Sequence, residues 1–238
     1  MKFLKVFVVL AVSLMLFGCK NDDSFKYPKS KIWAHRVNNP EDANKKIGVF
    51  DGIEIDLVLD TVSGNVLVSH EIDNHNKLTF RDFLRKIKKT GKTYYWLDVK
   101  NLYDDVGAIC DTIIVLADEF GFRNHFFVES WHSWSLKIAK EKGLRTSLWV
   151  TNIFDSQEHD TLRWKSNVEK AITVCNPDAL SAEYRMRKLL DEYFPENNIH
   201  LWQTPAAYND ENVKITREIC LDPHVKVLLV DYDKPIAY

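Results

Sequence analysis

Strand-like segments alternate with segments of helical apolar spacing from residue 31 to the end of the chain. The strands are expected near residues 32, 53, 95, 127, 147, 178, 200 and 227, with Val66–His70 as a hairpin partner of the second. The helices are expected over residues 39–46, 78–87, 106–120, 134–142, 160–174, 185–193 and 211–220. Eight strands and seven helices predict a compact α/β domain over residues 31–238, a (β/α)₈ (TIM) barrel. Its last helix is missing or replaced by the tail Asp231–Tyr238.

Two other classes are disfavoured. A doubly wound open sheet usually has fewer strands, and no glycine-rich loop follows the first strand here. A nucleic-acid binder normally carries a basic excess, whereas 32 Lys and Arg stand against 34 Asp and Glu. With 45% hydrophobic residues the chain is an ordinary globular protein, and no nucleic-acid or protein partner is predicted.

The first residues form a targeting segment. Lys2 and Lys5 precede the apolar run Val6–Phe17, which is shorter than the roughly 20 residues that span a bilayer. The run ends in Leu16-Phe17-Gly18-Cys19, which resembles the lipobox of bacterial lipoproteins. The alternative is a plain signal peptide in which the cysteine is accidental.

The lipobox resemblance implies a division of the N-terminal region. Residues 1–18 are predicted to be a lipoprotein signal peptide, and residues 19–30 a lipidated Cys19 with its tether. The lipid would anchor the protein to a membrane of the bacterial cell envelope, with the outer membrane or cell surface favoured over the inner membrane. The other cysteines, Cys110, Cys175 and Cys220, are widely spaced and give no disulfide or metal pattern, so buried thiols are expected.

Carboxylates gather at the expected strand ends. Glu54 and Asp56 are two residues apart on one strand, so their side chains point to the same face. The apolar residues between and beside them belong to the opposite face, which places the acids inside the barrel. Asp98 and Lys100 repeat this spacing on the next strand. Three converging carboxylates predict a site for a hard divalent cation, Mg²⁺ or Ca²⁺.

Two histidines follow neighbouring strands. His35 and His70 lie at strand ends beside the predicted carboxylate cluster. Because imidazole titrates near neutral pH, one histidine can accept a proton while the other donates one. This pair suits the cleavage of a phosphodiester, with Arg36, Lys100 and the cation stabilising the charge on the phosphate oxygens.

The order of these motifs resembles the glycerophosphodiester phosphodiesterase family. The motifs are His35-Arg36, Glu54-Ile55-Asp56, His70-Glu71 and Leu97-Asp98-Val99-Lys100, against His-Arg, Glu-x-Asp, His-Asp and Glu-x-Lys on a (β/α)₈ barrel in the family. The larger superfamily includes phosphatidylinositol-type phospholipases C. The resemblance implies that Glu54, Asp56 and Asp98 hold the cation. It also implies that His35 and His70 are the acid–base pair, and that Arg36 and Lys100 contact phosphate.

The sequence departs from the family pattern at four places. Val37-Asn38-Asn39 replaces the usual glycine after His-Arg, Glu71 replaces Asp, and Asp98 replaces a longer Glu. The family also carries an inserted segment after its second histidine, where Ile72–Lys77 is short. The short form is similar to menorin-like relatives as well.

Later strand ends supply further pocket candidates. Glu129 and Glu183 are expected to assist the cation, to bind a substrate hydroxyl or to form salt bridges within the barrel. Trp149 and Trp202 are expected in the pocket wall or the core.

Three functions remain open from the residues. The first is an enzyme, a metal-dependent phosphodiester hydrolase acting on a glycerophosphodiester or related phospholipid headgroup. The second is a catalytically degenerate ligand-binding lipoprotein on the same barrel, because the segment after His70 is short and Asp98 replaces Glu. The third is a glycosidase with paired acids, which leaves the two histidines without a role.

Overall fold

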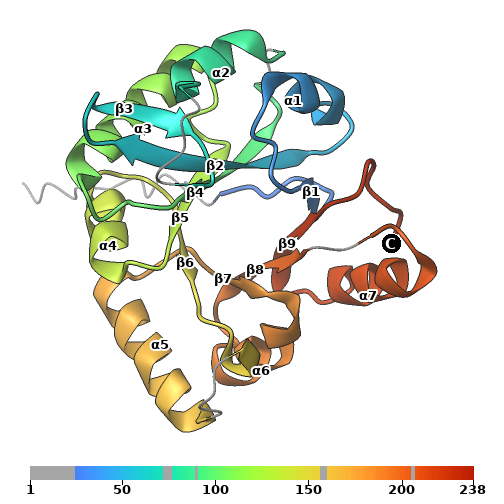
Figure 1. Ribbon diagram of the computed structural model, residues 1–238. Coiled ribbons are helices and arrows are strands. Elements are labelled where there is room, and N and C mark those ends of the chain that lie inside the picture. Colours follow the sequence, from blue (N-terminus) through green and yellow to red (C-terminus); the bar gives the residue numbers. More distant parts are fainter. Residues whose placement is uncertain (1–24, 72–76, 89–90, 156–159, 205–206) are drawn as a thin grey trace, which may run out of the picture.

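The computed structural model describes residues 25–71, 77–88, 91–155, 160–204 and 207–238 (Figure 1). The predicted signal peptide, Cys19 and residues 72–76 of the short segment after Glu71 lie outside these ranges. The strands are β1 (Ile32–Ala34), β2 (Gly52–Asp60), β3 (Asn65–Val68), β4 (Tyr94–Val99), β5 (Phe126–Ser130), β6 (Thr146–Trp149), β7 (Ala179–Glu183), β8 (Asn198–Gln203) and β9 (Val225–Val230). The helices are α1 (Pro40–Lys46), α2 (Phe80–Lys86), α3 (Val106–Phe120), α4 (Ser133–Glu141), α5 (Thr161–Cys175), α6 (Arg187–Tyr193) and α7 (Asp210–Cys220), with 3₁₀ turns η1 (Ile153–Asp155) and η2 (Tyr184–Met186).

All strands except β3 are parallel and close into a barrel. The order runs β1-β9-β8-β7-β6-β5-β4-β2, and β1 pairs with β2 through Ala34 and Ile53 to complete the ring. β3 returns antiparallel beside β2 as a hairpin partner. Figure 1 looks along the barrel, with the helices arranged around it. The predicted (β/α)₈ barrel is confirmed, and no helix follows β9 in the described part of the chain.

Capping residues set both ends of α3. The carboxylate of Asp105 accepts a hydrogen bond from the Ala108 backbone N–H at 2.9 Å and starts α3. Gly121 ends it with φ of 76°, a left-handed conformation that glycine adopts without a Cβ clash. The predicted helix 106–120 therefore has the bounds that its capping residues indicate.

One strand is shifted along the sequence from its expected bounds. The strand near residue 178 is expected over residues 177–180, whereas β7 begins at Ala179 and continues to Glu183. Asp178 lies just before the strand. Its carboxylate accepts hydrogen bonds from the Thr146 backbone N–H at 2.8 Å and from Lys140 at 2.6 Å. The expected helix 185–193 likewise opens with the turn η2 before α6.

Aromatic side chains fill the barrel interior between the site and the opposite pole. This interior cluster consists of Trp33, Trp96, Phe127, Val227 and Leu229, all buried. A Cβ on Gly52 would lie 2.1 Å from the Trp33 ring, so a glycine at this position makes room for the indole.

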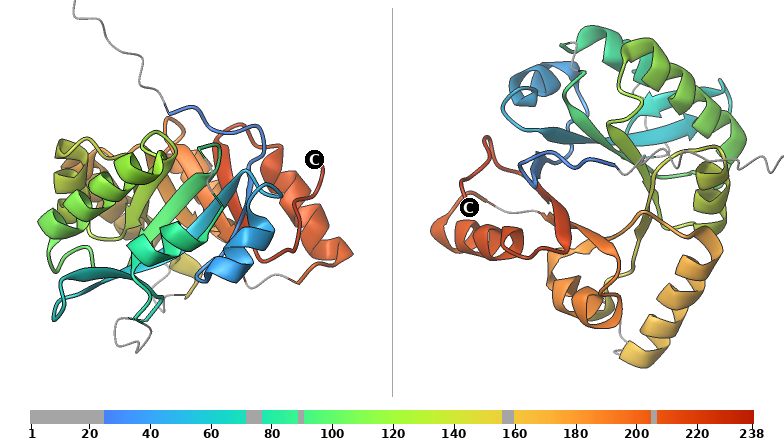
Figure 2. Two further views of the ribbon diagram at one scale, coloured as in Figure 1. Left: turned by 90° about the horizontal axis from the view of Figure 1, so that it is seen from above. Right: turned by 180° about the vertical axis from the view of Figure 1, so that it is seen from behind.

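The chain enters the barrel at the pole where the strands begin, which we call the N-terminal pole (Figure 2). Phe25 packs edge-to-face against Tyr94 at the start of β4, and its ring lies under the guanidinium of Arg145, just before β6. Tyr27 reaches further in and its hydroxyl lies 2.9 Å from Nε2 of His200. The residues that precede the first strand therefore close this end of the barrel.

His200 is a buried histidine with two hydroxyl partners. Tyr27 contacts its Nε2, and the Ser147 hydroxyl lies 3.1 Å from its Nδ1. Burial lowers the pKa of His200 to about 3, so the folded protein keeps it neutral. An unfolded histidine titrates near 6.5, and the unfolded chain therefore takes up a proton first as the pH falls.

Replacing His200 with glutamine should reduce the loss of stability in mild acid. In the wild type this histidine contributes stability that is fully present above about pH 6.5 and declines toward pH 3, by about 2 kcal/mol at pH 5. The measurement is the free energy of urea unfolding at pH 7.5 and pH 5 for both proteins. An unchanged pH dependence in His200→Gln would contradict this assignment.

The remaining cysteines are buried and unpaired. Cys110, Cys175 and Cys220 are free thiols within α3, α5 and α7, as the sequence predicts. Among the described residues no helix combines the length and apolar character needed to cross a membrane.

Candidate active site

Three carboxylates from two adjacent strands meet at the barrel mouth. Glu54 and Asp56 project from β2, and Asp98 projects from β4, where it is the register partner of Asp56. One oxygen from each carboxylate lies within 4.8 Å of the other two. Glu54 and Asp56 are 2% and 1% exposed, so the predicted burial of these acids inside the barrel is observed.

Two neighbours neutralise and orient Asp56. The Lys100 ammonium lies 2.6 Å from its Oδ1 and also pairs with Asp98. The Asn38 amide donates to Oδ2 at 2.6 Å, and its carbonyl accepts from the Asp56 backbone N–H at 2.9 Å. Burial alone would raise the pKa of Asp56, but Lys100 and Asn38 outweigh it and hold that pKa below its ordinary value. Asp56 is therefore ionised at neutral pH.

The pKa values of Glu54 and Asp98 shift in the opposite direction to that of Asp56. Burial and the neighbouring carboxylates raise the pKa of Glu54 well above its ordinary value. Burial also raises the pKa of Asp98, against the opposing charge of Lys100. The Arg36 backbone N–H donates to Oε2 of Glu54 at 2.6 Å, whereas Oε1 is buried with no hydrogen-bond partner among the described residues. An unpartnered carboxylate oxygen within an all-oxygen cluster fits a hard divalent cation, for which these three residues would be the ligands.

His35 is held by a carboxylate behind it. Its Nδ1 donates to Oδ1 of Asp231, just after β9, at 2.8 Å. The hydrogen bond fixes the tautomer and leaves Nε2 facing Glu54 Oε2 at 4.0 Å. Arg36, the next residue, has a φ of 51°, an unusual value outside glycine, and this turn directs its backbone N–H to Glu54.

His70 lies at the rim rather than in the cavity wall. Its Nδ1 donates to the Glu71 carboxylate at 2.8 Å, and its Nε2 lies 3.2 Å from a guanidinium nitrogen of Arg36. Its side chain is 41% exposed. Arg36 therefore links the two predicted histidines: it follows His35 in the chain, and its guanidinium contacts His70.

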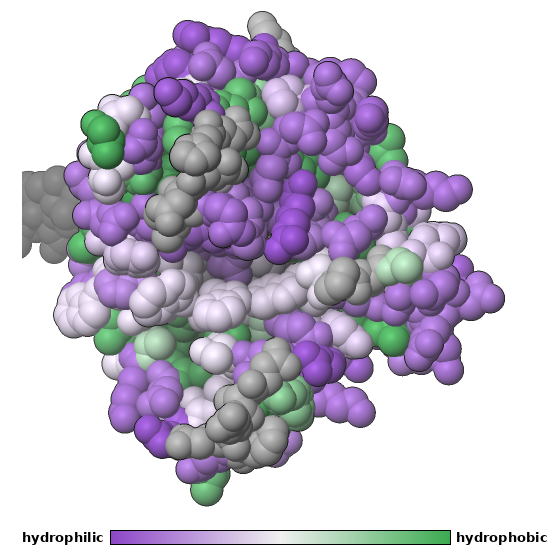
Figure 3. Space-filling model, viewed as in Figure 1, coloured by the Kyte–Doolittle hydropathy of each residue, from purple (hydrophilic) through white to green (hydrophobic). Residues whose placement is uncertain are grey.

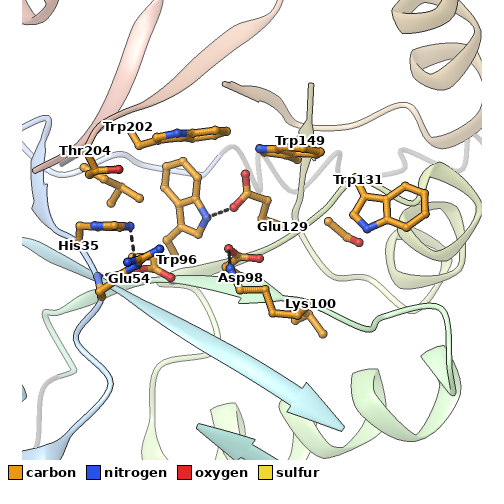
Figure 4. A pocket seen from close by; sticks show the side chains of 14 residues that line it. His35, Glu54, Trp96, Asp98, Lys100, Glu129, Trp131, Trp149, Trp202 and Thr204 are labelled. Atoms are coloured by element: carbon orange, nitrogen blue, oxygen red, sulfur yellow. Dashed lines mark hydrogen bonds and ion pairs between the residues drawn. The ribbon is translucent and has the colours of Figure 1, made fainter. Parts of the chain in front are cut away.

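A cavity of about 310 Å³ opens above this cluster, and we call it the mouth cavity (Figure 4). His35, Glu54, Asp98 and Lys100 line it on one side. Its volume is at the lower end of the range for small-molecule sites.

Glu129 forms the floor of the mouth cavity. The Trp96 indole N–H donates to its carboxylate at 2.5 Å, and the Ser181 hydroxyl donates to its other oxygen. Burial, together with the charge of Asp98, raises the pKa of Glu129 to about 8. Glu129 is therefore protonated over most of the neutral range and available to hydrogen-bond a substrate oxygen.

Trp149 and Trp202 line the mouth cavity, as expected, but Glu183 does not. The two indole planes differ by 14° with centroids 6.4 Å apart, and Figure 4 shows both rings edge-on along one side of the cavity. Glu183 is turned away by local pairing, because its carboxylate accepts from the Arg185 side chain at 2.8 Å and from the Arg185 backbone N–H at 3.2 Å. Of the alternatives for Glu183, the salt bridge is the one observed.

Several residues that organise the site were not assigned a role from sequence. Asn38 stands where a family glycine was expected, and Asp231 follows the last strand without a motif. Trp96 and Ser181 face Glu129 from strand positions that read as ordinary core. Strand alternation could have placed Trp96 and Ser181 on the interior face, but nothing in the sequence indicates the partners of Asn38 and Asp231.

Replacing Lys100 with methionine should make protein stability depend more strongly on divalent cations. The change removes the positive charge between Asp56 and Asp98 and should cost about 2 kcal/mol, less than for a fully buried pair because Lys100 is partly exposed. Thermal unfolding with and without Mg²⁺ or Ca²⁺ should show a larger cation-induced rise in Tm than in the wild type.

Lys140→Met is the matched control for that experiment. Lys140 also pairs with one carboxylate, Asp178, at 2.6 Å, but outside the mouth cavity. This variant should lose stability without any added response to cations. Equal cation responses in the wild type and Lys100→Met would contradict a cation site at these carboxylates.

The fold is shared with solved phosphodiesterases. A putative glycerophosphoryl diester phosphodiesterase from Agrobacterium tumefaciens superposes with a TM-score of 0.64 at 13% identity, over 86% of this chain and 94% of that chain. A glycerophosphodiester phosphodiesterase from Thermotoga maritima gives 0.58 at 15%, over 87% and 97%. A calcium-dependent phosphoinositol-specific phospholipase C from Pseudomonas sp. gives 0.52 at 11%, over 86% and 88%.

No protein-family model and no curated protein matches the sequence. The three structures named above are 11–15% identical to this chain, so they establish the fold and leave the substrate open. The expected resemblance to glycerophosphodiester phosphodiesterases is thereby confirmed as a shared fold.

Proposed function

We propose that this protein is a divalent-cation-dependent phosphodiester hydrolase. The observation that carries the proposal is the convergence of Glu54, Asp56 and Asp98 within 4.8 Å beside His35, whose Nε2 faces them. The shared fold with phosphodiesterases supports the same assignment.

Four residues at the barrel mouth, His35, His70, Arg36 and Lys100, have parts in the proposed reaction. Hydrolysis adds water, breaks one P–O ester bond and yields a phosphomonoester and an alcohol. Nε2 of His35 accepts the proton of the attacking water, and Asp231 stabilises the imidazolium that results. His70 at the rim donates a proton to the leaving oxygen. Arg36 and Lys100 face the phosphate oxygens.

Mg²⁺ or Ca²⁺ held by the three carboxylates would supply positive charge against the phosphate oxygens. The calcium dependence of the Pseudomonas phospholipase C supports a cation in this role. Among substrates, a glycerophosphodiester or a related phospholipid headgroup fits a cavity of about 310 Å³.

The test is hydrolysis of bis-p-nitrophenyl phosphate and glycerophosphocholine by the purified protein with Mg²⁺ or Ca²⁺. Activity should disappear on addition of EDTA and return with excess cation. It should also be lost in His70→Ala. Absence of turnover with every added cation, in protein shown to be folded, would remove the proposal.

A non-catalytic binding protein is the second candidate. The observation that favours it is that Lys100 already pairs with Asp56 and Asp98, two of the three carboxylates that the cation would use. Binding of a phosphodiester without turnover, and without any effect of cations, would select this candidate. Cation-dependent turnover would exclude it.

We also propose that Cys19 carries the lipid that anchors the protein at the cell envelope, on the outer membrane or cell surface. The support is the Leu16–Cys19 motif at the end of the apolar run. Metabolic labelling with an alkyne fatty acid should mark the wild type and not Cys19→Ser. Equal labelling of both proteins would contradict lipidation at Cys19.

A further inference from the structure

A second cavity, of about 400 Å³, lies beside the mouth cavity, and we call it the side cleft. It is bounded by the end of β6, the turn η1 and the inner face of α5. Its floor consists of side chains that are all buried and apolar: Leu148, Val150, Ile153, Trp164 and Val168. Exposed polar and charged side chains, among them Asp160, Arg163 and Asn167, form its rim, so the side cleft is an apolar recess with a polar edge.

Two tryptophans join the two cavities. Trp131 and Trp149 line both the mouth cavity and the side cleft. They are 54% and 36% exposed, and Figure 4 shows them at the end of the mouth cavity away from His35. A belt of intermediate hydropathy also crosses this face of the molecule in Figure 3. A ligand whose phosphate lies at the carboxylates can therefore extend past these indoles into the side cleft.

The polar groups of the cleft floor are already satisfied. The indole N–H of Trp164 donates to the Thr151 carbonyl at 3.0 Å, so the ring presents only apolar surface to the cleft. An apolar chain seated on this floor leaves the Trp164 N–H paired, whereas polar groups of a ligand would instead meet the hydrogen-bonding side chains of the rim, such as Arg163 and Asn167.

From this geometry we infer that the side cleft binds a hydrocarbon chain carried by one alcohol of the phosphodiester. The inference rests on the proposed function and narrows its substrate class to alkyl- or acyl-bearing diesters with a single chain, of the lysophospholipid kind. The chain lies in the side cleft, its ester linkage passes Trp131 and Trp149, and the phosphate occupies the mouth cavity. Bare headgroup diesters would fill only the mouth cavity and bind more weakly.

Chain-length dependence of binding tests this inference. Butylphosphocholine and octylphosphocholine share one headgroup, and both are used below their micelle concentrations. Burial of a methylene is worth about 0.8 kcal/mol, roughly fourfold in affinity. With even half of the four extra methylenes buried, the octyl compound should bind at least about tenfold more tightly. Tryptophan fluorescence reports binding, since Trp131, Trp149 and Trp164 line the side cleft.

Variants that fill the side cleft should remove this preference. Ala171 is half-buried and Asn167 exposed, and both line the cleft from α5. Ala171→Trp and, as a second variant with little risk to folding, Asn167→Trp should lower the octyl-to-butyl affinity ratio to below about twofold. Lys170→Trp adds the same bulk at an exposed position of α5 that does not line the cleft, and should keep the wild-type ratio.

Equal binding of the two compounds by the wild type would overturn the inference, as would an unchanged ratio in both cleft-filling variants. Hydrolysis of bis-p-nitrophenyl phosphate, measured on the same preparations, separates this failure from that of the proposed function. Turnover without a chain-length effect removes only the side-cleft inference. A chain-length effect abolished by Ala171→Trp, with no turnover, removes the hydrolase and keeps the chain-binding site.

Discussion

His35→Ala should lower kcat for bis-p-nitrophenyl phosphate by about 10²- to 10⁴-fold, the usual contribution of a general acid or base. The imidazole is held between Asp231 at 2.8 Å and Glu54 at 4.0 Å, and alanine removes the ring that faces the carboxylates. Steady-state kinetics with saturating Mg²⁺ or Ca²⁺ measure the loss, and KM should change much less than kcat because the cation site is intact.

His224→Gln is the matched control for His35→Ala. His224 also pairs with a carboxylate, Asp191, but it precedes β9 at the N-terminal pole. Its replacement should leave kcat unchanged. Asp231→Asn should give a smaller loss than His35→Ala, because it removes the orienting carboxylate and leaves the imidazole. Full activity in folded His35→Ala would exclude the proposed acid–base pair.

Asp56→Asn should abolish cation-dependent activity, with a loss of about 10³-fold or more, since the charge stabilisation supplied by a catalytic cation is worth several kcal/mol. Asp56 is the carboxylate that its neighbours keep ionised, through Lys100 and Asn38. An amide of nearly the same shape keeps the packing but loses the charge. Calorimetric titration with Ca²⁺ and Mg²⁺ should show weaker binding, in parallel with the loss of turnover.

Asp51→Asn provides the comparison for Asp56→Asn. Asp51 precedes the same strand at the N-terminal pole, where its carboxylate accepts a hydrogen bond from the Ser30 backbone N–H at 3.0 Å. Cation affinity and turnover should both be retained in this variant. If Asp56→Asn binds the cation as tightly as the wild type, then the three carboxylates are not its ligands.

The carboxylate cluster was accessible from the sequence because it depends on two simple regularities. Alternation along β2 puts Glu54 and Asp56 on one face, and parallel pairing brings Asp98 beside Asp56. The same reasoning located His35 at the mouth. Strand alternation is a property of the backbone, and it carries over from sequence to structure with little help from tertiary contacts.

The partners of these residues depended on loops, which follow no such rule. Arg36 adopts a left-handed conformation that its residue type does not indicate, and this turn delivers its N–H to Glu54. Asp231 reaches His35 only because β9 closes the barrel beside β1. The choice between the alternatives for Glu183 depended on a loop in the same way, since its pairing with Arg185 is set by the turn after β7.

The entry of the chain at the N-terminal pole determines how a lipid on Cys19 would orient the barrel. Five residues separate Cys19 from Phe25, and the intervening chain reaches at most about 20 Å. Such a short connection would hold the N-terminal pole toward the membrane, and the mouth cavity at the opposite end of the barrel would face the surrounding water. The protein would then meet its diesters as dispersed monomers that have left a bilayer, and would not draw them sideways from the leaflet to which it is fixed.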